Sequence, residues 1–217
     1  MQRPVNLLQG HVPLLDELAG TGDKLIISVA AGICTHHIEN KLGKARIIRT
    51  MPNMPAKIRQ GITCLCRGKF ATEEDMGFAK DIFKHIGEVL EIEEPMMNAA
   101  TAVSGNGPAY VAFYLNAHNL GCDLAAGKKD EFLKEFSAAA CAVGFSRKDA
   151  RLLTEKTFSG TIEYLKKTGI TPQELMVKVA SKGGSTEAAL KVLNEGASLA
   201  DAVKAGRARA DELSRRD

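Results

Sequence analysis

Hydroxyl side chains and two adjacent glycines stand between two helical patterns, from Ser181 to Thr186. Gly183 and Gly184 have no Cβ, so the backbone can approach a ligand closely. The first N–H groups of the helix that follows lack intrahelical partners and attract an anion such as a carboxylate. Ser181, Ser185 and Thr186 add hydroxyl donors and acceptors. The pattern predicts a site for a small anion; the alternative is a plain helix–helix connection capped by Ser185.

Three segments resemble those of the pyrroline-5-carboxylate reductases, in the same order and at similar spacing. Residues 179–186 read Val-Ala-Ser-Lys-Gly-Gly-Ser-Thr, where the family usually has Val-Thr-Ser-Pro-Gly-Gly-Thr-Thr. Residues 104–110 read Ser-Gly-Asn-Gly-Pro-Ala-Tyr, and residues 49–56 read Arg-Thr-Met-Pro-Asn-Met-Pro-Ala. Residues 28–32 are similar to a fourth, weaker block. Together these segments are specific, and they span nearly the whole chain.

The resemblance implies a reaction and a role for each site residue. A cofactor, NADPH or NADH, would pass hydride to the cyclic imine 1-pyrroline-5-carboxylate and give L-proline. Ser181 and the backbone of Gly183, Gly184 and Ser185 would hold the substrate carboxylate. Thr186 would bond the ring nitrogen and act as the catalytic residue. Such a mechanism requires no acid–base dyad.

Two strand-like runs, Leu25–Ala30 and Ala45–Met51, are each followed by small or rigid residues. In a parallel α/β sheet, ligands bind beyond the carboxyl ends of the strands. We therefore expect the cofactor to bind at these ends. The residues expected to contact it are Ala30, Ala31, Gly32, Pro52 and Asn53. The alternative for Asn53 is a turn residue.

The chain departs from the family pattern at several positions. Lys182 stands in place of a proline, Asn106 in place of a serine and Met54 in place of a threonine. The family begins with a strand and a Gly-x-Gly-x-x-Gly loop, and residues 20–22, Gly-Thr-Gly, lack the helix that should follow. The sequence is therefore interpreted as an N-terminally truncated member, and we expect this chain to bind NADPH weakly and to have little activity.

Strands alternating with helices in the first half predict an α/β layer with a mostly parallel sheet. Further strands are expected at Ile62–Cys66 and Val89–Ile92, and an amphipathic helix at Thr72–Ile86. Beyond about residue 94 the pattern is all helical. The fold class is thus a partial Rossmann-like α/β domain, residues 1–94, followed by an all-α dimerisation and substrate-binding domain, residues 95–217. Expected helices are Lys129–Val143, Lys148–Lys167, Pro172–Ala180, Thr186–Asn194 and Leu199–Ser214.

Composition excludes several classes of protein. A net charge of +3 in 217 residues does not favour nucleic acid as a partner. No apolar run is long enough to span a bilayer, and the start lacks a signal-peptide core, so we expect a cytoplasmic protein. Five scattered cysteines predict reduced thiols. Cys34, His36 and His37 lack a second cluster, so no metal is expected.

The segment Pro108–Ala126 is apolar on most of its circumference, which predicts burial at a subunit interface and hence a homodimer. The resemblance also implies a dimer-based assembly, or a larger homo-oligomer, in which the helical domain of one chain completes the site of another. Two alternative functions remain open: a non-catalytic dimeric homologue acting as a scaffold, and a reductase for another small imine or oxo acid.

Overall fold

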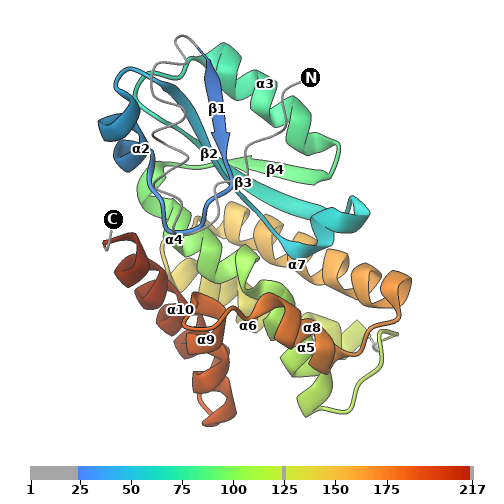
Figure 1. Ribbon diagram of the computed structural model, residues 1–217. Helices are drawn as coiled ribbons and strands as arrows, with labels where there is room; N and C mark the ends of the chain where they lie inside the picture. Colours follow the sequence, from blue (N-terminus) through green and yellow to red (C-terminus); the bar gives the residue numbers. More distant parts are fainter. Residues whose placement is uncertain (1–23, 124–125, 216–217) are drawn as a thin grey trace.

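Figure 1 shows the computed structural model, which describes residues 24–123 and 126–215. A four-stranded sheet forms the upper part, and a group of helices packs beneath it. The strands are β1 (Leu25–Ser28), β2 (Arg46–Pro52), β3 (Gly61–Arg67) and β4 (Gly87–Glu91), in that order across the sheet. The helix expected near residues 12–18 and the Gly20–Gly22 segment lie outside the described residues.

The sheet is mixed. β1 pairs with β2, and β3 with β4, in the parallel sense, but β2 and β3 are antiparallel. A parallel β2–β3 pair would need a crossover of about a dozen residues or more. Residues 53–60 are too few, and they form a short 3₁₀ turn, η1 (Met54–Ile58), instead. The expectation of a mostly parallel sheet is therefore right for the outer pairs and wrong for the central one.

Two helices pack on the sheet from opposite faces. α2 (Thr35–Leu42) places Ile38 against Ile47, and α3 (Glu73–Lys84) packs against Ile48 and Leu65. Because successive side chains of a strand point to opposite faces, neighbouring Ile47 and Ile48 serve the two helices. α3 begins, as expected, at a cap: the Thr72 hydroxyl accepts the N–H of Asp75, whose carboxylate accepts the N–H of Thr72.

The helices of the lower part follow β4 in the sequence. They start with a 3₁₀ turn, η2 (Glu94–Met96), a single turn, α4 (Met97–Ala100), and a π-helical turn, η3 (Thr101–Gly105). The longer helices are α5 (Gly107–Ala117), α6 (Ala126–Ala142), α7 (Arg147–Thr168), α8 (Pro172–Val179), α9 (Ser185–Asn194) and α10 (Leu199–Ser214). Within the described ranges, no helix is long and apolar enough to cross a membrane.

α5 corrects one sequence argument. The helix ends at Ala117, not at Ala126, and Asn119 has a left-handed backbone (φ +51°) that no continuing helix allows. Val111, Ala112 and Leu115 are fully buried within the single chain, where α7 and α8 cover α5. The apolar circumference of this helix is therefore satisfied without a second chain, and it does not argue for a dimer.

One hydrophobic core joins the sheet to the helices. Ile62, Cys64 and Cys66 alternate along β3 and point to the same face. On that face they pack in one cluster with residues of α5, α6 and α7, among them Leu115, Phe136 and Leu153. This face of the sheet and the helical bundle are thus held in a fixed relation.

Candidate functional site

The loop between α8 and α9 forms a tight turn. The carbonyl of Ser181 accepts the N–H of Gly184 at 3.0 Å, and Gly183 has φ +70°. A glycine with positive φ at the third position of a four-residue turn is the pattern of a type II turn, with Lys182 at the second position. α9 then begins at Ser185 with Gly184 as its N-cap residue, so no side chain at the cap position covers the first N–H groups.

Charged side chains of α9 and α10 bond the backbone of this loop. The Glu187 carboxylate accepts the N–H of Gly183 at 2.7 Å, and Arg209 Nε donates to the Gly183 carbonyl at 2.8 Å. Arg209 also pairs with Glu212 on α10. Two backbone N–H groups that the sequence assigned to the substrate are therefore engaged within the chain: that of Gly183 by the Glu187 carboxylate and that of Gly184 by the Ser181 carbonyl. Ser181 is exposed, and the remaining N–H groups at the start of α9 are the donors available to an anion.

The hydroxyls of Ser185 and Thr186 both bond the side chain of Asn106. Thr186 Oγ donates to Asn106 Oδ1 at 2.7 Å, and Ser185 Oγ donates to the same oxygen at 2.9 Å. Thr186 is 5% exposed and Asn106 is 2% exposed. Two of the segments that carry the sequence signature thus meet, although they are 80 residues apart.

Asn106 is the functional candidate that the sequence noted as a departure but gave no role. Its Nδ2 donates to the Tyr110 hydroxyl at 3.3 Å, and that hydroxyl donates to the Ala102 carbonyl at 3.0 Å. Burial raises the pKa of Tyr110, so its hydroxyl keeps its proton. The sequence shows an amide side chain, Asn106, between two glycines. Residue spacing alone does not reveal which groups that amide bonds.

The glycines beside Asn106 serve close packing, as one sequence interpretation expected. A Cβ on Gly105 would lie 2.7 Å from Cε of Met51, and one on Gly107 would lie 2.5 Å from Cγ2 of Thr157. α5 begins at Gly107, one residue before the predicted start at Pro108. The turn before it is π-helical, so the chain widens here without a full break.

The predicted cofactor residues follow the carboxyl ends of β1 and β2, which are parallel and point the same way. β2 runs three residues beyond the point where Ser28, the last residue of β1, pairs with Arg49. Ala30 is buried, while Ala31, Gly32 and Pro52 are partly exposed. Gly32 has φ +83°, and a Cβ there would lie 3.8 Å from Cβ of Leu213 in α10. A flat ring beyond these ends would meet small side chains and backbone.

Asn53 has a structural role that the sequence did not predict: its side chain holds the β2–β3 loop in place. Its Oδ1 accepts the N–H of Ile62 at 3.0 Å, and its Nδ2 donates to Thr157 Oγ1 at 3.4 Å. The side chain is 6% exposed. It therefore ties the β2–β3 loop to β3 and to α7.

The two halves of the site adjoin. Met51, near the carboxyl end of β2, packs against Gly105, and Thr157, which bonds Asn53, packs against Gly107. Asn106, which holds Thr186, lies between these two glycines in the chain. The structure thus brings the carboxyl end of β2 beside the segment that contacts the loop between α8 and α9.

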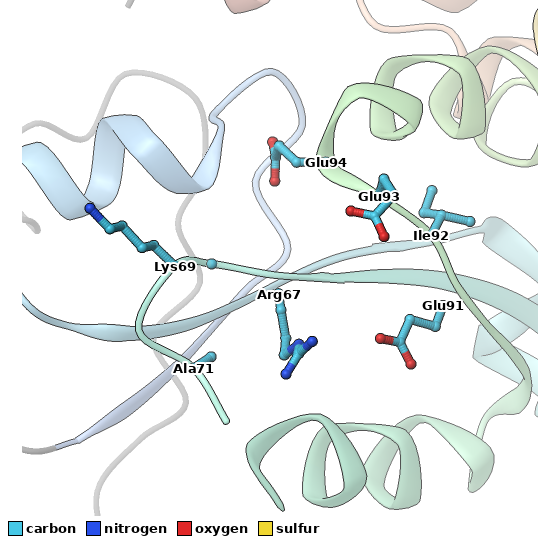
Figure 2. Close-up of a pocket in the computed structure, with 8 residues that line it drawn as sticks. Arg67, Lys69, Ala71, Glu91, Ile92, Glu93 and Glu94 are labelled. Carbon is cyan, nitrogen blue, oxygen red and sulfur yellow. The ribbon is translucent and has the colours of Figure 1, made fainter. Parts of the chain in front are cut away.

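The pocket in Figure 2 lies elsewhere. It has a volume of about 270 Å³ and is lined by the ends of β3 and β4, including Arg67 and Glu91. The register places Arg67 opposite Ile48, near the amino end of β2, so this pocket opens at the sheet edge opposite Asn53. Arg67 pairs with Glu73 at the start of α3. None of the predicted site residues lines it.

A cluster of polar side chains near that pocket, formed by Arg49, Glu94 and Cys66, stabilises the fold. Arg49, 4% exposed in its side chain, pairs with Glu94, and Cys66 Sγ donates to Glu94 Oε2 at 2.9 Å. Burial raises the pKa of Cys66, and that of Cys64 to about 12, so both thiols stay protonated. All five cysteines are free. Among the described residues, no group of three or more His, Cys, Asp or Glu side chains could hold a metal.

An α/β sheet joined to a helical half that carries a hydroxyl-lined loop is the arrangement found here, and comparison with known proteins identifies the class as NAD(P)H-dependent reductases. Residues 130–213 match the family model for pyrroline-5-carboxylate reductase dimerisation. The chain is 34% identical over 207 residues to the pyrroline-5-carboxylate reductase of Synechocystis, an alignment that covers 94% of this chain and 71% of that protein. The Arabidopsis thaliana reductase is 35% identical over 88% of this chain and 64% of its own length.

A solved structure gives the same result. The pyrroline-5-carboxylate reductase of Coxiella burnetii is 32% identical and matches with a TM-score of 0.51, over 93% of this chain and 70% of that one. The chain belongs to the pyrroline-5-carboxylate reductase family, whose members reduce a C=N bond with NADPH or NADH in proline biosynthesis.

Proposed function

We propose that this chain is built for the reaction of its family, the reduction of 1-pyrroline-5-carboxylate to L-proline, at the low rate that the weak NADPH binding expected from the sequence allows. The observation that carries the proposal is the buried hydroxyl of Thr186 at the start of α9, on a loop whose backbone suits a carboxylate. When bound, NADPH or NADH supplies the hydride. The protein's own residues hold the substrate, keep water out and bond the ring nitrogen.

The residues of the proposed substrate loop have two roles. Ser181 and the backbone N–H of Ser185 bind the carboxylate, helped by the positive end of the α9 dipole. Gly183 and Gly184, whose N–H groups bond Glu187 and the Ser181 carbonyl, line the site with backbone that the carboxylate can approach closely. Thr186 is the catalytic residue, because its hydroxyl bonds the ring nitrogen, where charge changes during the reaction. The Gly183 carbonyl, fixed by Arg209, keeps the loop in place for both tasks.

Ala30, Ala31, Gly32, Pro52 and Asn53 form the cofactor contact of the proposal. Ala31 and Gly32 offer backbone at the sheet edge, and Pro52 limits the conformations of the loop that follows β2. Asn53 contributes by holding that loop against β3 and α7, since its amide bonds Ile62 and Thr157.

The organisation of the whole protein is part of the proposal. Residues 1–94 form the dinucleotide-binding part, and residues 95–217 form the helical part that binds substrate and joins two chains. The match of residues 130–213 to a dimerisation model supports a homodimer, or a larger homo-oligomer built from it. We also propose that the protein is cytoplasmic, as the sequence led us to expect.

The proposal is tested by Thr186→Ala. Oxidation of NADPH in the presence of 1-pyrroline-5-carboxylate gives kcat and KM, and calorimetry with L-proline reports on the substrate loop without the cofactor. Loss of the hydroxyl should raise the barrier of the chemical step by on the order of 1–3 kcal/mol and leave KM for NADPH nearly unchanged. Thr186→Ser, which keeps a hydroxyl, is the matched control. Kinetics of Thr186→Ala equal to wild type would remove Thr186 from the mechanism.

A further inference from the structure

We propose that Asn106 is a positioning residue that fixes the Thr186 hydroxyl as a hydrogen-bond acceptor toward the substrate. The site then selects a ring whose nitrogen carries a proton, and it disfavours an isosteric ring that offers only a lone pair. This inference rests on the proposed function, because it assumes that the ring of the substrate faces Thr186. It assigns a role to a residue at which the chain departs from the usual serine.

The direction of the hydrogen bonds follows from a backbone carbonyl. The carbonyl of Ala102 can only accept, so the Tyr110 hydroxyl, 3.0 Å away, directs its single proton there. Toward Asn106 the same hydroxyl offers only lone pairs. The NH₂ group of the Asn106 amide must therefore face Tyr110, at 3.3 Å, and Oδ1 must face the opposite way.

The amide oxygen in turn sets the hydroxyls of the loop. Asn106 Oδ1 accepts from Thr186 Oγ at 2.7 Å and from Ser185 Oγ at 2.9 Å, which uses both of its lone pairs. Each hydroxyl has one proton, and both protons are committed. Thr186 Oγ keeps two lone pairs and has no proton to give, so it can only accept from a ligand.

Packing holds the amide in this orientation. Asn106 is 2% exposed, and Tyr110 is 1% exposed. Gly206 of α10 faces both groups: a Cβ there would lie 2.7 Å from Asn106 Nδ2 and 3.2 Å from the Tyr110 oxygen. The glycine leaves room for the NH₂ group, and the enclosure denies the amide the water that would permit other arrangements.

The chemical consequence concerns the charge of the substrate. An imine carbon accepts hydride more readily when its nitrogen is protonated, and a protonated nitrogen needs an acceptor. A Thr186 oxygen with its proton turned away supplies that acceptor. A neutral imine would place its nitrogen lone pair against the lone pairs of Thr186, so the reactive form is bound in preference.

Two ligands that need no cofactor test the inference. L-proline presents a protonated ring nitrogen, whereas tetrahydrofuran-2-carboxylate presents a ring oxygen that can only accept. NMR titration of the wild-type chain should give a Kd ratio that favours L-proline by roughly tenfold or more, the value of one charge-assisted hydrogen bond. In Asn106→Leu, similar in size but with no acceptor, the Thr186 hydroxyl can turn toward the ligand. The ratio should then fall about tenfold.

Two further variants keep the experiment decisive. Asn106→Asp retains acceptor oxygens for both hydroxyls and should keep at least the wild-type ratio. Tyr110→Phe preserves shape but removes the group that orients the amide, so its ratio should fall between those of wild type and Asn106→Leu. Thermal unfolding of each variant reports on folding separately.

The outcomes separate this inference from the proposed function. If the wild-type chain binds both ligands equally, or if Asn106→Leu and Tyr110→Phe keep the wild-type ratio, the inference is overturned and the substrate loop stands. If the wild-type chain shows saturable binding of neither ligand, the assignment of the loop to this substrate fails and the inference fails with it.

Discussion

Gly160 of α7 lies against the carbonyl of Gln60 so closely that a Cβ on the glycine would be 2.1 Å from that oxygen. The same Cβ would lie 3.0 Å from Cβ of Pro55. α7 therefore touches the backbone of the β2–β3 loop, which contains Asn53. This contact sets the distance between the sheet and the longest helix beside the site.

Gly160→Ala should destabilise the protein. The added methyl meets backbone, which cannot rotate away, so α7 or the loop must shift at a cost of roughly 1–3 kcal/mol. Urea unfolding followed by circular dichroism measures the change. Gly77→Ala in α3 is the matched control, because a Cβ there would meet nothing within 4 Å. That variant should gain about 0.5–1 kcal/mol, since alanine is the better helix former. Equal effects of the two substitutions would contradict the packing argument.

Lys182→Pro should be tolerated and should stabilise the loop by about 0.4–1 kcal/mol. Lys182 occupies the second position of the turn closed by Ser181 and Gly184, where proline is favoured in type II turns. Thermal unfolding measures the gain, and binding of L-proline should stay within a few-fold of wild type. A large loss of affinity would show instead that Lys182 contacts the substrate and would favour a different imine or oxo acid.

Cys64 and Cys66 should resist thiol reagents in the folded protein. Both are fully buried, and burial raises the pKa of Cys64 to about 12, so almost no thiolate forms at neutral pH. Iodoacetamide labelling followed by peptide mass spectrometry should modify Cys34 and Cys141, which are partly exposed, before either buried thiol. Labelling of Cys64 at the rate seen in denaturant would show that β3 is accessible in the native state.

Glu174 should contribute to the pH dependence of stability. Its carboxylate accepts the backbone N–H and the hydroxyl of Thr171, and these bonds lower the pKa of Glu174 in the folded state. A lowered folded pKa gives stability that is present above the unfolded pKa and is lost as the pH falls through the folded value. Glu174→Gln should therefore lose stability near pH 7 and approach wild type in acid.

The control for that measurement is Glu195→Gln, an exposed residue just after α9 that belongs to no capping box. Its unfolding curve should follow wild type across the same pH range. A difference between Glu174→Gln and wild type that persists unchanged into acid would assign the effect to something other than ionisation of the cap.

Local signals predicted most of the helices, because caps and apolar periodicity act over a few residues. The ends of α10 are as predicted, and α8 begins at Pro172 as predicted, where Thr171 and Glu174 form its cap. The antiparallel β2–β3 pair was missed because strand direction depends on the connection as well as on the strands. Asn106 was missed as a partner of Thr186 because the two are 80 residues apart, and periodicity carries no information on such contacts.

The core that joins β3 to the helical bundle has a consequence for cleavage and unfolding of the protein. Ile62, Cys64 and Cys66 lie in the same cluster as Phe136 and Leu153. A cut near residue 94 would leave one face of the sheet bare in one fragment and a matching apolar surface bare in the other. The two fragments should therefore be poorly soluble alone and should recover native structure when refolded together. The intact chain should melt in a single calorimetric transition.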